Sequence, residues 1–440
     1  MSSPGYPSHW RRQSLPSYRG LNTPVSPPSS KPFVSYVAKE RSAPLEPSLP
    51  PDRRLNEGLN ERLQTLEVPS LDDLDEVDDP EIKDCQFIGS YNWTKKTHPT
   101  IIVPGKWQEL LAPPYTVQPD MGIHYIDQNS YRMPSANLLP LIVAVNQKQK
   151  NEGTTPFPWG TIDFVTDRNG LRKLLRWIIG GEVKDFRIDA QLAGEKTVLL
   201  SRWEKRTREN FNGRTYGFQF EKASTAAASG CKEGCGHHRI ITYDFNGLKM
   251  VVRYEVDACM PQPRTRLARK SEASTLDSLA DAMSNMNLTT TVAPFSSNTM
   301  PALNIINAGT NVPQAATIEL TTIAVYRREK FNWDEAYPQL FLSQTSHHFL
   351  AVHNRGQFIS VEKRKLVSDP EFEKIHKSMK PALKKLRKIL EIIQQVAVKH
   401  GTGGRLTFVC SDGELAVYQR RSQTSCLPDE AMSCFDLKQD

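Results

Sequence analysis

The sequence lacks any apolar run that could cross a bilayer. A transmembrane helix needs about 20 consecutive, mostly apolar residues, and no segment of the 440 residues comes near that length. The first ten residues also lack the apolar core of a secretory signal peptide. We therefore expect an intracellular protein, nuclear or cytoplasmic, that makes no use of a membrane.

Cysteine is scarce as well. The seven cysteines are an odd number and lie mostly in apolar, strand-like segments, which favours reduced thiols over a disulfide framework. One group has ligand types that suit zinc: Cys231, Cys235, His237 and His238. Four ligands this close in sequence would require a very tight loop, so we interpret the segment as a surface loop.

Three enzyme signatures are missing. The chain has neither a Walker-type phosphate loop nor a Gly-x-Ser-x-Gly nucleophile elbow. A single Asp-rich run, at 72–79, has no second copy, whereas prenyl diphosphate synthases need two such motifs on facing helices. The net charge of +7 permits a polyanionic partner but does not by itself indicate one.

Composition divides the chain into segments. Eleven of the 31 prolines fall within the first 51 positions, and residues 1–80 are predicted to be a disordered tail. Residues 81–425 are predicted to form a single domain, interrupted by a disordered insert at 261–314 that is rich in Ser, Thr, Asn and Pro, and residues 426–440 a C-terminal tail. Inside the insert, helical spacing is either a chance fit or a short helix that docks on a protein partner: Leu276, Leu279, Met283 and Met286.

Hydrophobic periodicity predicts a mixed, largely antiparallel sheet flanked by helices, an α+β class. The strongest signal is Asn246-Gly247 between two alternating apolar runs, 238–245 and 248–257, which predicts a β-hairpin. Helices are expected at 170–179, 334–343 and 370–399. Strands are expected at 186–192, 197–203, 316–326 and 349–353, with order starting near Cys85 and a closing hairpin of 405–410 and 414–420.

Acidic residues stand on several of these apolar segments. Glu255 and Asp257 are two apart on a strand, so both carboxylates should leave the same face of the sheet, opposite the face of Val252, Tyr254 and Val256. Glu319 lies on another apolar strand, and Glu221 follows an aromatic segment. Several carboxylates that converge would hold a hard divalent cation. Each acid taken alone is better explained by a salt bridge at a strand edge.

The order of these pieces resembles the DXO-type RNA 5′-end decapping nucleases, a branch of the PD-(D/E)XK superfamily, in a divergent fungal-type form. The family's motifs correspond to Arg168 in a strand-to-helix segment, Gly217-Phe218-Gln219-Phe220-Glu221, Glu255-Val256-Asp257, Glu319-Leu320-Thr321 and Gln344. The similarity covers roughly residues 160–360 and preserves the motif order.

The resemblance implies a PD-(D/E)XK-like fold and a metal-dependent site on RNA. Mg²⁺ or Mn²⁺ would be held by Glu221, Glu255, Asp257 and Glu319, and Glu255, Asp257, Glu319 and Gln344 would be catalytic. The RNA 5′ phosphate or cap would be contacted by Arg168 and Gln344. Apart from the resemblance, Lys249 and Arg253 share the strand parity of Glu255 and offer a nearby cation, and Arg253 is assigned to the substrate. We expect the carboxylates of Glu255, Asp257 and Glu319 to lie about 4–5 Å apart, within reach of one ion.

The resemblance breaks at one position. The family's lysine, two residues beyond the strand acid, is Thr321 here, and a hydroxyl cannot replace an ammonium group. The sequence therefore predicts an RNA 5′-end-binding protein in which catalysis is either reduced or lost. The alternative is a non-catalytic scaffold that binds a protein partner through the basic 370–399 helix and the 261–314 insert.

Overall fold

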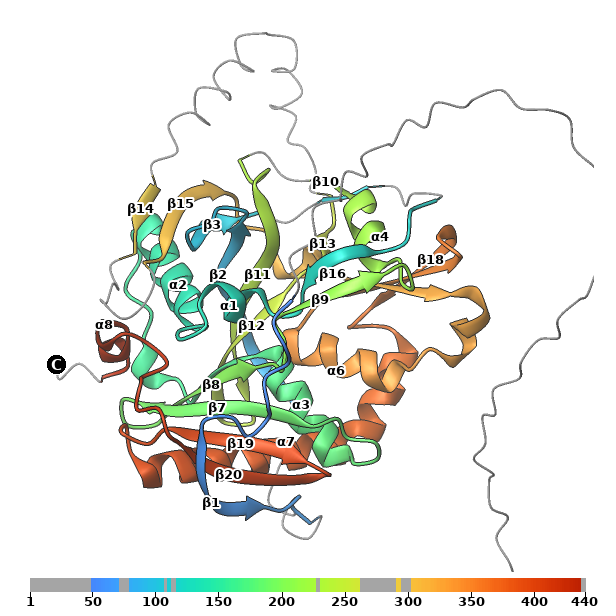
Figure 1. Ribbon diagram of the computed structural model, residues 1–440. Coiled ribbons are helices and arrows are strands. Elements are labelled where there is room, and N and C mark those ends of the chain that lie inside the picture. Colours follow the sequence, from blue (N-terminus) through green and yellow to red (C-terminus); the bar gives the residue numbers. More distant parts are fainter. Residues whose placement is uncertain are drawn as a thin grey trace, which may run out of the picture. The chain divides into compact units, whose positions relative to one another are not determined.

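The computed structural model describes residues 49–70, 79–106, 109–111, 116–226, 230–261, 290–293 and 302–436, which belong to one unit beginning at Leu49 (Figure 1). Residues 1–48 of the predicted tail and the four apolar residues between 276 and 286 lie outside this part of the chain.

A twelve-stranded sheet runs through the described residues (Figure 1). Its spatial order is β1 (Leu59–Leu66), β20 (Glu414–Arg420), β19 (Leu406–Ser411), β7 (Phe186–Ala193), β8 (Thr197–Trp203), β6 (Phe164–Asp167), β12 (Leu248–Glu255), β11 (Gly234–Phe245), β2 (Ile82–Thr94), β3 (Thr100–Gly105), β15 (Asn304–Gly309) and β14 (Thr290–Val292). Its neighbours are antiparallel except where β6 meets β8 and β12, and where β3 meets β15.

Two smaller sheets complete the strand structure of the same residues. A six-stranded sheet has the order β10 (Thr225–Ala226), β4 (Glu109–Leu110), β13 (Ala258–Cys259), β16 (Thr317–Ala324), β17 (His347–Asn354) and β18 (Gln357–Lys365). A two-stranded ribbon pairs β5 (Met121–Tyr125) with β9 (Arg208–Asn212). Because β12 and β13 are separated by only two residues, the chain passes directly from the large sheet to the six-stranded sheet at 255–258.

Helices cover both faces of the large sheet. On one face, apolar side chains of α3 (Arg168–Ile179), α6 (Trp333–Ser343) and α7 (Pro370–His400) share a core with β7, β8, β11 and β12. On the other face, α2 (Leu139–Glu152) packs on β2 and β3. The remaining helical segments are short: α1 (Gln128–Arg132), α4 (Gly217–Ser224), α8 (Asp429–Met432), η2 (Trp159–Thr161), η4 (Gln314–Ala316), η5 (Val325–Lys330) and η6 (Ser433–Phe435). No helix within the described ranges is long and apolar enough to span a membrane.

This architecture confirms the predicted α+β class with a mostly antiparallel sheet between helices. The predicted hairpin is also present: β11 pairs with β12 from His238–Glu255 to Phe245–Leu248. Its turn residues Asn246 and Gly247 have φ values of 48° and 83°, the left-handed conformations that a two-residue turn of this kind needs and that Asn-Gly adopts at low cost.

Three predicted boundaries are wrong. The predicted tail contains β1, whose side chains Leu59 and Leu66 are buried against β20. The predicted insert contributes β14 and β15, with β15 pairing in parallel with β3. The predicted C-terminal tail folds back as α8 and η6, so that Phe435 is buried beside Trp159. Each of these segments is stabilised by partners distant in sequence, and such partners cannot be predicted from local composition.

Candidate active site

Four acids gather where the chain leaves the large sheet. Glu255 is the last residue of β12, and Asp257 precedes β13, which pairs with β16 through Ala258 and Ile318. The pairing brings β16 and its Glu319 alongside, and Asp257 Oδ2 accepts a hydrogen bond from the Leu320 amide at 2.7 Å. The predicted alternation holds here, because Val252, Tyr254 and Val256 lie in the core shared with the helices while Glu255 faces the other way.

Glu221 reaches the same region from helix α4. Glu221 and Asp257 both line a cavity of about 370 Å³. Asp120 lines it too, but its carboxylate already accepts hydrogen bonds from Thr215 Oγ1 at 2.8 Å and from the Gln219 amide at 2.9 Å. Asp120 therefore anchors the start of α4 and so positions Glu221.

The acids influence one another's ionisation. Burial, followed by repulsion from Glu255 and Glu319, raises the pKa of Glu221 to about 8. Burial also raises the pKa of Asp257 well above its ordinary value, with added repulsion from Glu319 and Glu221. The pKa of Glu255 is raised by burial too, although Arg202 and Arg168 oppose the rise. The Glu255 side chain is nevertheless exposed to solvent.

Arginine is the cation beside these acids. Arg168, the first residue of α3, places Nη1 2.9 Å from Glu319 Oε2, and both side chains are nearly buried. Its guanidinium also lies 5.4 Å from the centre of the Tyr254 ring. The resemblance placed Arg168 near the RNA, and its position beside the acids is compatible with that role.

The glutamine that meets the acids is Gln339, which the sequence analysis missed. Gln339 Nε2 donates to Glu319 Oε1, and Ser343 Oγ, one turn along the same helix face, accepts from Arg168 at 3.3 Å. Gln344 instead ends α6 in a left-handed conformation with φ 49°, and its Nε2 donates to the Phe341 carbonyl at 2.7 Å. The predicted catalytic and substrate-binding roles of Gln344 therefore gain no support from its position.

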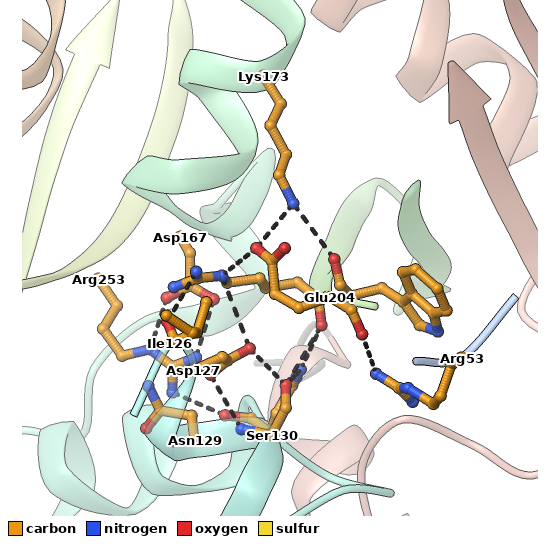
Figure 2. Close-up of polar contacts among 12 residues, drawn as sticks. Arg53, Ile126, Asp127, Asn129, Ser130, Asp167, Lys173, Glu204 and Arg253 are labelled. Carbon is orange, nitrogen blue, oxygen red and sulfur yellow. Dashed lines mark hydrogen bonds and ion pairs between the residues drawn. The ribbon is translucent and has the colours of Figure 1, made fainter. Parts of the chain in front are cut away.

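Arg253 is enclosed rather than available to a substrate. Its side chain is 1% exposed and forms two hydrogen bonds with Asp167, at 2.7 and 2.9 Å (Figure 2). The Asn137 carbonyl and the Tyr91 hydroxyl accept two more, at 2.7 and 3.1 Å. Asp167 and Arg253 pair across the parallel β6–β12 contact, so this ion pair fixes the strand next to Glu255, and direct substrate binding by Arg253 remains a prediction without structural support.

Thr321 stands where the DXO-type motif has its lysine. Thr321 Oγ1 lies 3.0 Å from His348 Nε2 on the neighbouring strand β17. Burial lowers the pKa of His348 to about 4, although Glu319 opposes the drop, so the imidazole is neutral near pH 7. In place of the lysine the site thus has an uncharged Thr–His pair.

The donor set suits a hard divalent cation in its chemistry, since all four groups are carboxylates. Burial, together with repulsion from neighbouring acids, raises the pKa values of Glu221, Glu255 and Asp257, and a bound cation would relieve both. The spacing is less favourable: in the part of the chain that the structure describes, no three His, Cys, Asp or Glu side chains are placed to hold one ion. The predicted approach of Glu255, Asp257 and Glu319 to a single ion is therefore not seen in this arrangement, where Arg168 and Gln339 engage Glu319.

The predicted surface loop at 231–238 is wrong. Residues from Gly234 onward form β11, and His237 and His238 are both buried. His237 Nδ1 lies 2.9 Å from Asn92 Oδ1, and the His238 ring stacks on Tyr91 with ring centres 5.0 Å apart. Burial lowers the pKa of both histidines well below the ordinary value, so they are neutral residues of the strand.

Comparisons place this fold among known proteins. A family described as a domain of unknown function (DUF8563) matches residues 80–435. No curated protein matches the sequence.

Three solved structures illustrate the similarity. Rai1 of Scheffersomyces stipitis has a TM-score of 0.50 at 12% identity, over 84% of this chain and 97% of that one. Rai1 of Candida albicans, in complex with pU5-Mn2+, has a TM-score of 0.49 at 11% identity over 81% and 95%. Rai1 of S. pombe has a TM-score of 0.49 at 14% identity over 80% and 98%. At such low identity the first match shows the fold alone, and the predicted resemblance to DXO-type proteins is confirmed at that level.

Proposed function

The chain belongs to the DUF8563 family, and from that premise and the gathered acids we propose that it binds the 5′ end of RNA together with a divalent cation, and that its hydrolytic activity is low or lost. The observation that carries the proposal is the meeting of Glu221, Glu255, Asp257 and Glu319 beside an arginine but no lysine.

The carboxylates support the cation half of the proposal. Among the described residues, no protein donor hydrogen-bonds to the Glu221 or Glu255 carboxylate. The Leu320 amide donates to Asp257 Oδ2 and leaves Oδ1 for a cation. These three would hold Mg²⁺ or Mn²⁺, while Glu319 stays paired with Arg168. A bound cation would neutralise charge and polarise a phosphate oxygen or a water molecule.

Arg168 supports the RNA half. A guanidinium group presents several N–H donors in a plane and stays charged at all accessible pH values. The contacts with Glu319 and Ser343 use Nη1, which leaves donors on the same group for a terminal phosphate. An arginine cannot accept a proton from water at neutral pH, so it stabilises charge without acting as a base.

Reduced hydrolysis follows from the Thr321–His348 pair. A hydroxyl and a neutral imidazole supply no positive charge beside the attacking water, and general acid–base or electrostatic groups of this kind contribute about 10²–10⁴-fold to rates. The fold alone implies no activity, because one fold hosts many functions.

The test separates binding from turnover. Mn²⁺ affinity is measured by isothermal titration, and binding of a 5′-phosphorylated pentauridylate is measured in Mn²⁺ and in EDTA, with chromatography of any products. We expect Glu255→Gln combined with Asp257→Asn to weaken Mn²⁺ binding, and the Mn²⁺-dependent part of oligonucleotide binding, by at least about 100-fold. Glu182→Gln, which removes an exposed carboxylate elsewhere, should change neither.

Two results would count against the proposal. Binding of the oligonucleotide that is equal in EDTA and Mn²⁺ and unchanged in the double variant would remove the acids from RNA recognition. Rapid turnover that Asp257→Asn abolishes would keep the site but contradict the loss of activity.

A second candidate function is non-catalytic binding of a protein partner. The observation favouring it is that, within the described ranges, the neighbouring acids are not spaced so that three metal-type ligands could hold one ion. The basic face of α7 supports it less, because Lys384 lies 3.8 Å from Asp79, and Arg387 and Lys388 both pair with Glu391. If Mn²⁺ does not bind at millimolar concentration, this second function is preferred.

A further inference from the structure

A second cavity has Arg202 in its wall, the arginine that also acts on the pKa of Glu255. It has a volume of about 580 Å³ and is formed by residues 49–58, α1, the end of β8, the segment that follows it and β20. It shares no lining residue with the acid cavity. Its size falls within the range typical of sites for small organic ligands, about 300–1,000 Å³.

The lining of this cavity is strongly basic. Six arginines and one lysine face it, against two carboxylates, Glu57 and Asp189. Asp189 is already engaged, because Arg187 binds it through two hydrogen bonds at 2.7 and 3.2 Å and Thr407 donates a third at 2.8 Å. Among the described residues, no carboxylate lies within ion-pair distance of Arg53, Lys205 or Arg208. The cavity therefore carries a net positive charge that the protein does not neutralise.

Contacts behind the cavity wall hold some of these cations in place. Glu204 Oε1 binds Lys173 at 2.9 Å and Arg202 at 2.7 Å, while its carbonyl accepts from Arg53 Nη2 at 2.6 Å (Figure 2). The guanidinium groups of Arg53 and Arg187 lie 4.6 and 5.1 Å from the centre of the Trp203 ring. Groups fixed in this way lose little entropy when an anion arrives.

Several polar atoms at the cavity have no partner within the described part of the chain. Arg420 Nε and Nη2, Ser201 Oγ and Asn137 Oδ1 are buried without a hydrogen bond, and all three residues line the cavity. Buried polar groups without partners are costly and rare. Like charges also crowd together, since burial and the neighbouring Arg187 lower the pKa of Arg53. The Arg420 donors, the Ser201 hydroxyl and the crowded cations would be relieved by an anion with several acceptor oxygens, whereas Asn137 Oδ1 is an acceptor and requires a donor.

The rim adds an aromatic surface. Tyr131 is 39% exposed and lines the cavity. The Arg208 guanidinium lies 4.4 Å from the centre of its ring, and the Tyr125 ring is 5.2 Å away. An exposed aromatic ring beside arginines is the usual combination for a nucleobase and its phosphate, because the base stacks while the cations bind the phosphate.

We propose that this basic cavity is a second ligand site, which binds a nucleoside phosphate with the phosphate among the arginines and the base on Tyr131. Its chemistry is shared by a free nucleotide and by a nucleotide of a single RNA strand. The site needs no divalent cation and does not depend on the acid cluster.

The experiment uses the full chain in EDTA, at about 0.15 M salt, with AMP, adenosine, pyrophosphate and 5′-phosphorylated pentauridylate as probes in isothermal titration. We expect AMP or the oligonucleotide to bind, and adenosine to bind at least about tenfold more weakly than AMP, because the phosphate supplies most of the contact. Tyr131→Ala should weaken AMP by about tenfold but leave pyrophosphate unchanged. AMP binding as tight as that of the oligonucleotide identifies a free nucleotide as sufficient, and binding of the oligonucleotide alone identifies a strand; either supports the site.

The variants are chosen to preserve folding. The double variant Lys205→Gln/Arg208→Gln removes two cations that lie outside the core. Two separate single variants, Arg420→Gln and Arg420→Lys, test the inner wall of the cavity. The matched control, Lys374→Gln with Lys399→Gln, removes two exposed cations from α7. We expect the first pair to weaken phosphate binding by about tenfold or more and the control pair to change it little. Equal binding by the two pairs, adenosine as good as AMP, or no binding of any phosphate probe would each overturn the proposal.

Discussion

Replacing Arg168 by Gln should destabilise the protein in a way that depends on divalent cations. Arg168 and Glu319 form an ion pair at 2.9 Å with side chains only 12% and 10% exposed. Removing the guanidinium leaves the Glu319 carboxylate beside Glu221 and Asp257, whose pKa values repulsion already raises. Arg168 therefore supplies positive charge that allows these acids to lie close together.

The magnitude follows from burial. Breaking a buried ion pair by removing one partner costs about 3–5 kcal/mol, and we expect about 3 kcal/mol here in EDTA because some water reaches both groups. Loss of the arginine also makes the acid cluster more negative, so Mn²⁺ should bind the variant more tightly than the native protein. Each tenfold gain in affinity returns about 1.4 kcal/mol at saturation, which should reduce the difference to below about 1.5 kcal/mol.

The assay is urea unfolding in EDTA and in saturating Mn²⁺, with two companion variants. Arg168→Gln combined with Glu319→Gln should be more stable in EDTA than Arg168→Gln alone, because no unpaired carboxylate remains. Arg176→Gln breaks an exposed pair with Glu335, and should cost at most about 1 kcal/mol in either buffer. An equal loss for Arg168→Gln in both buffers, together with no rescue by Glu319→Gln, would refute the idea that this arginine balances the acid cluster.

Three further predictions follow from the packing. Burial lowers the pKa of His348 to about 4, so the stability that its neutral form contributes is present above about pH 6.5 and is lost as the pH falls towards 4. The free energy of unfolding, measured from pH 7 to pH 4, should lose about 3 kcal/mol of its pH dependence in His348→Gln. Asp167→Asn leaves the Arg253 guanidinium buried without its counter-ion and should cost about 3–5 kcal/mol in urea unfolding, with Arg253→Met restoring part of the loss in the double variant. Deleting residues 1–67 removes β1 and exposes the edge of β20, so melting should occur at lower temperature and light scattering should show association that the full chain lacks; an unchanged melting temperature would contradict the pairing.

The sequence was most informative where structure is local. The Asn246-Gly247 turn requires left-handed backbone that few other pairs adopt, so the β11–β12 hairpin could be predicted from two residues and their alternating flanks. Helix α7 was predicted to within a residue, because Asp369 caps it, Pro370 starts it and Gly401 follows its end. Strand alternation likewise placed Glu255 opposite Tyr254.

Segments held by distant partners could not be predicted in this way. Strand β1 has a largely polar sequence with buried leucines only at its ends, so its strand conformation depends on hydrogen bonds to β20. Strand β15 lies in a segment of low-complexity composition and is fixed by parallel pairing with β3. Neither pairing can be predicted from a local window of sequence.

The roles of the site residues stay predictions. Motif order selected four acids and Arg168, which lie near one another in the structure, and it selected Gln344 where Gln339 contacts Glu319. Helical periodicity held the better signal, since Gln339 and Ser343 are four residues apart and therefore share the face that meets Arg168. Thr321 was identified as the missing lysine, yet its contact with His348 required the parallel register of β16 and β17.

The pairing of β1 with β20 has a consequence for synthesis. The strand at residues 59–66 is synthesised well before its partner at 414–420. During that interval the early strand has no edge to join, and the growing chain must keep its backbone groups solvated or shielded by other proteins. The edge of the large sheet therefore closes only after residues 414–420 have emerged, and a nascent chain released before that point keeps an open, adhesive sheet edge.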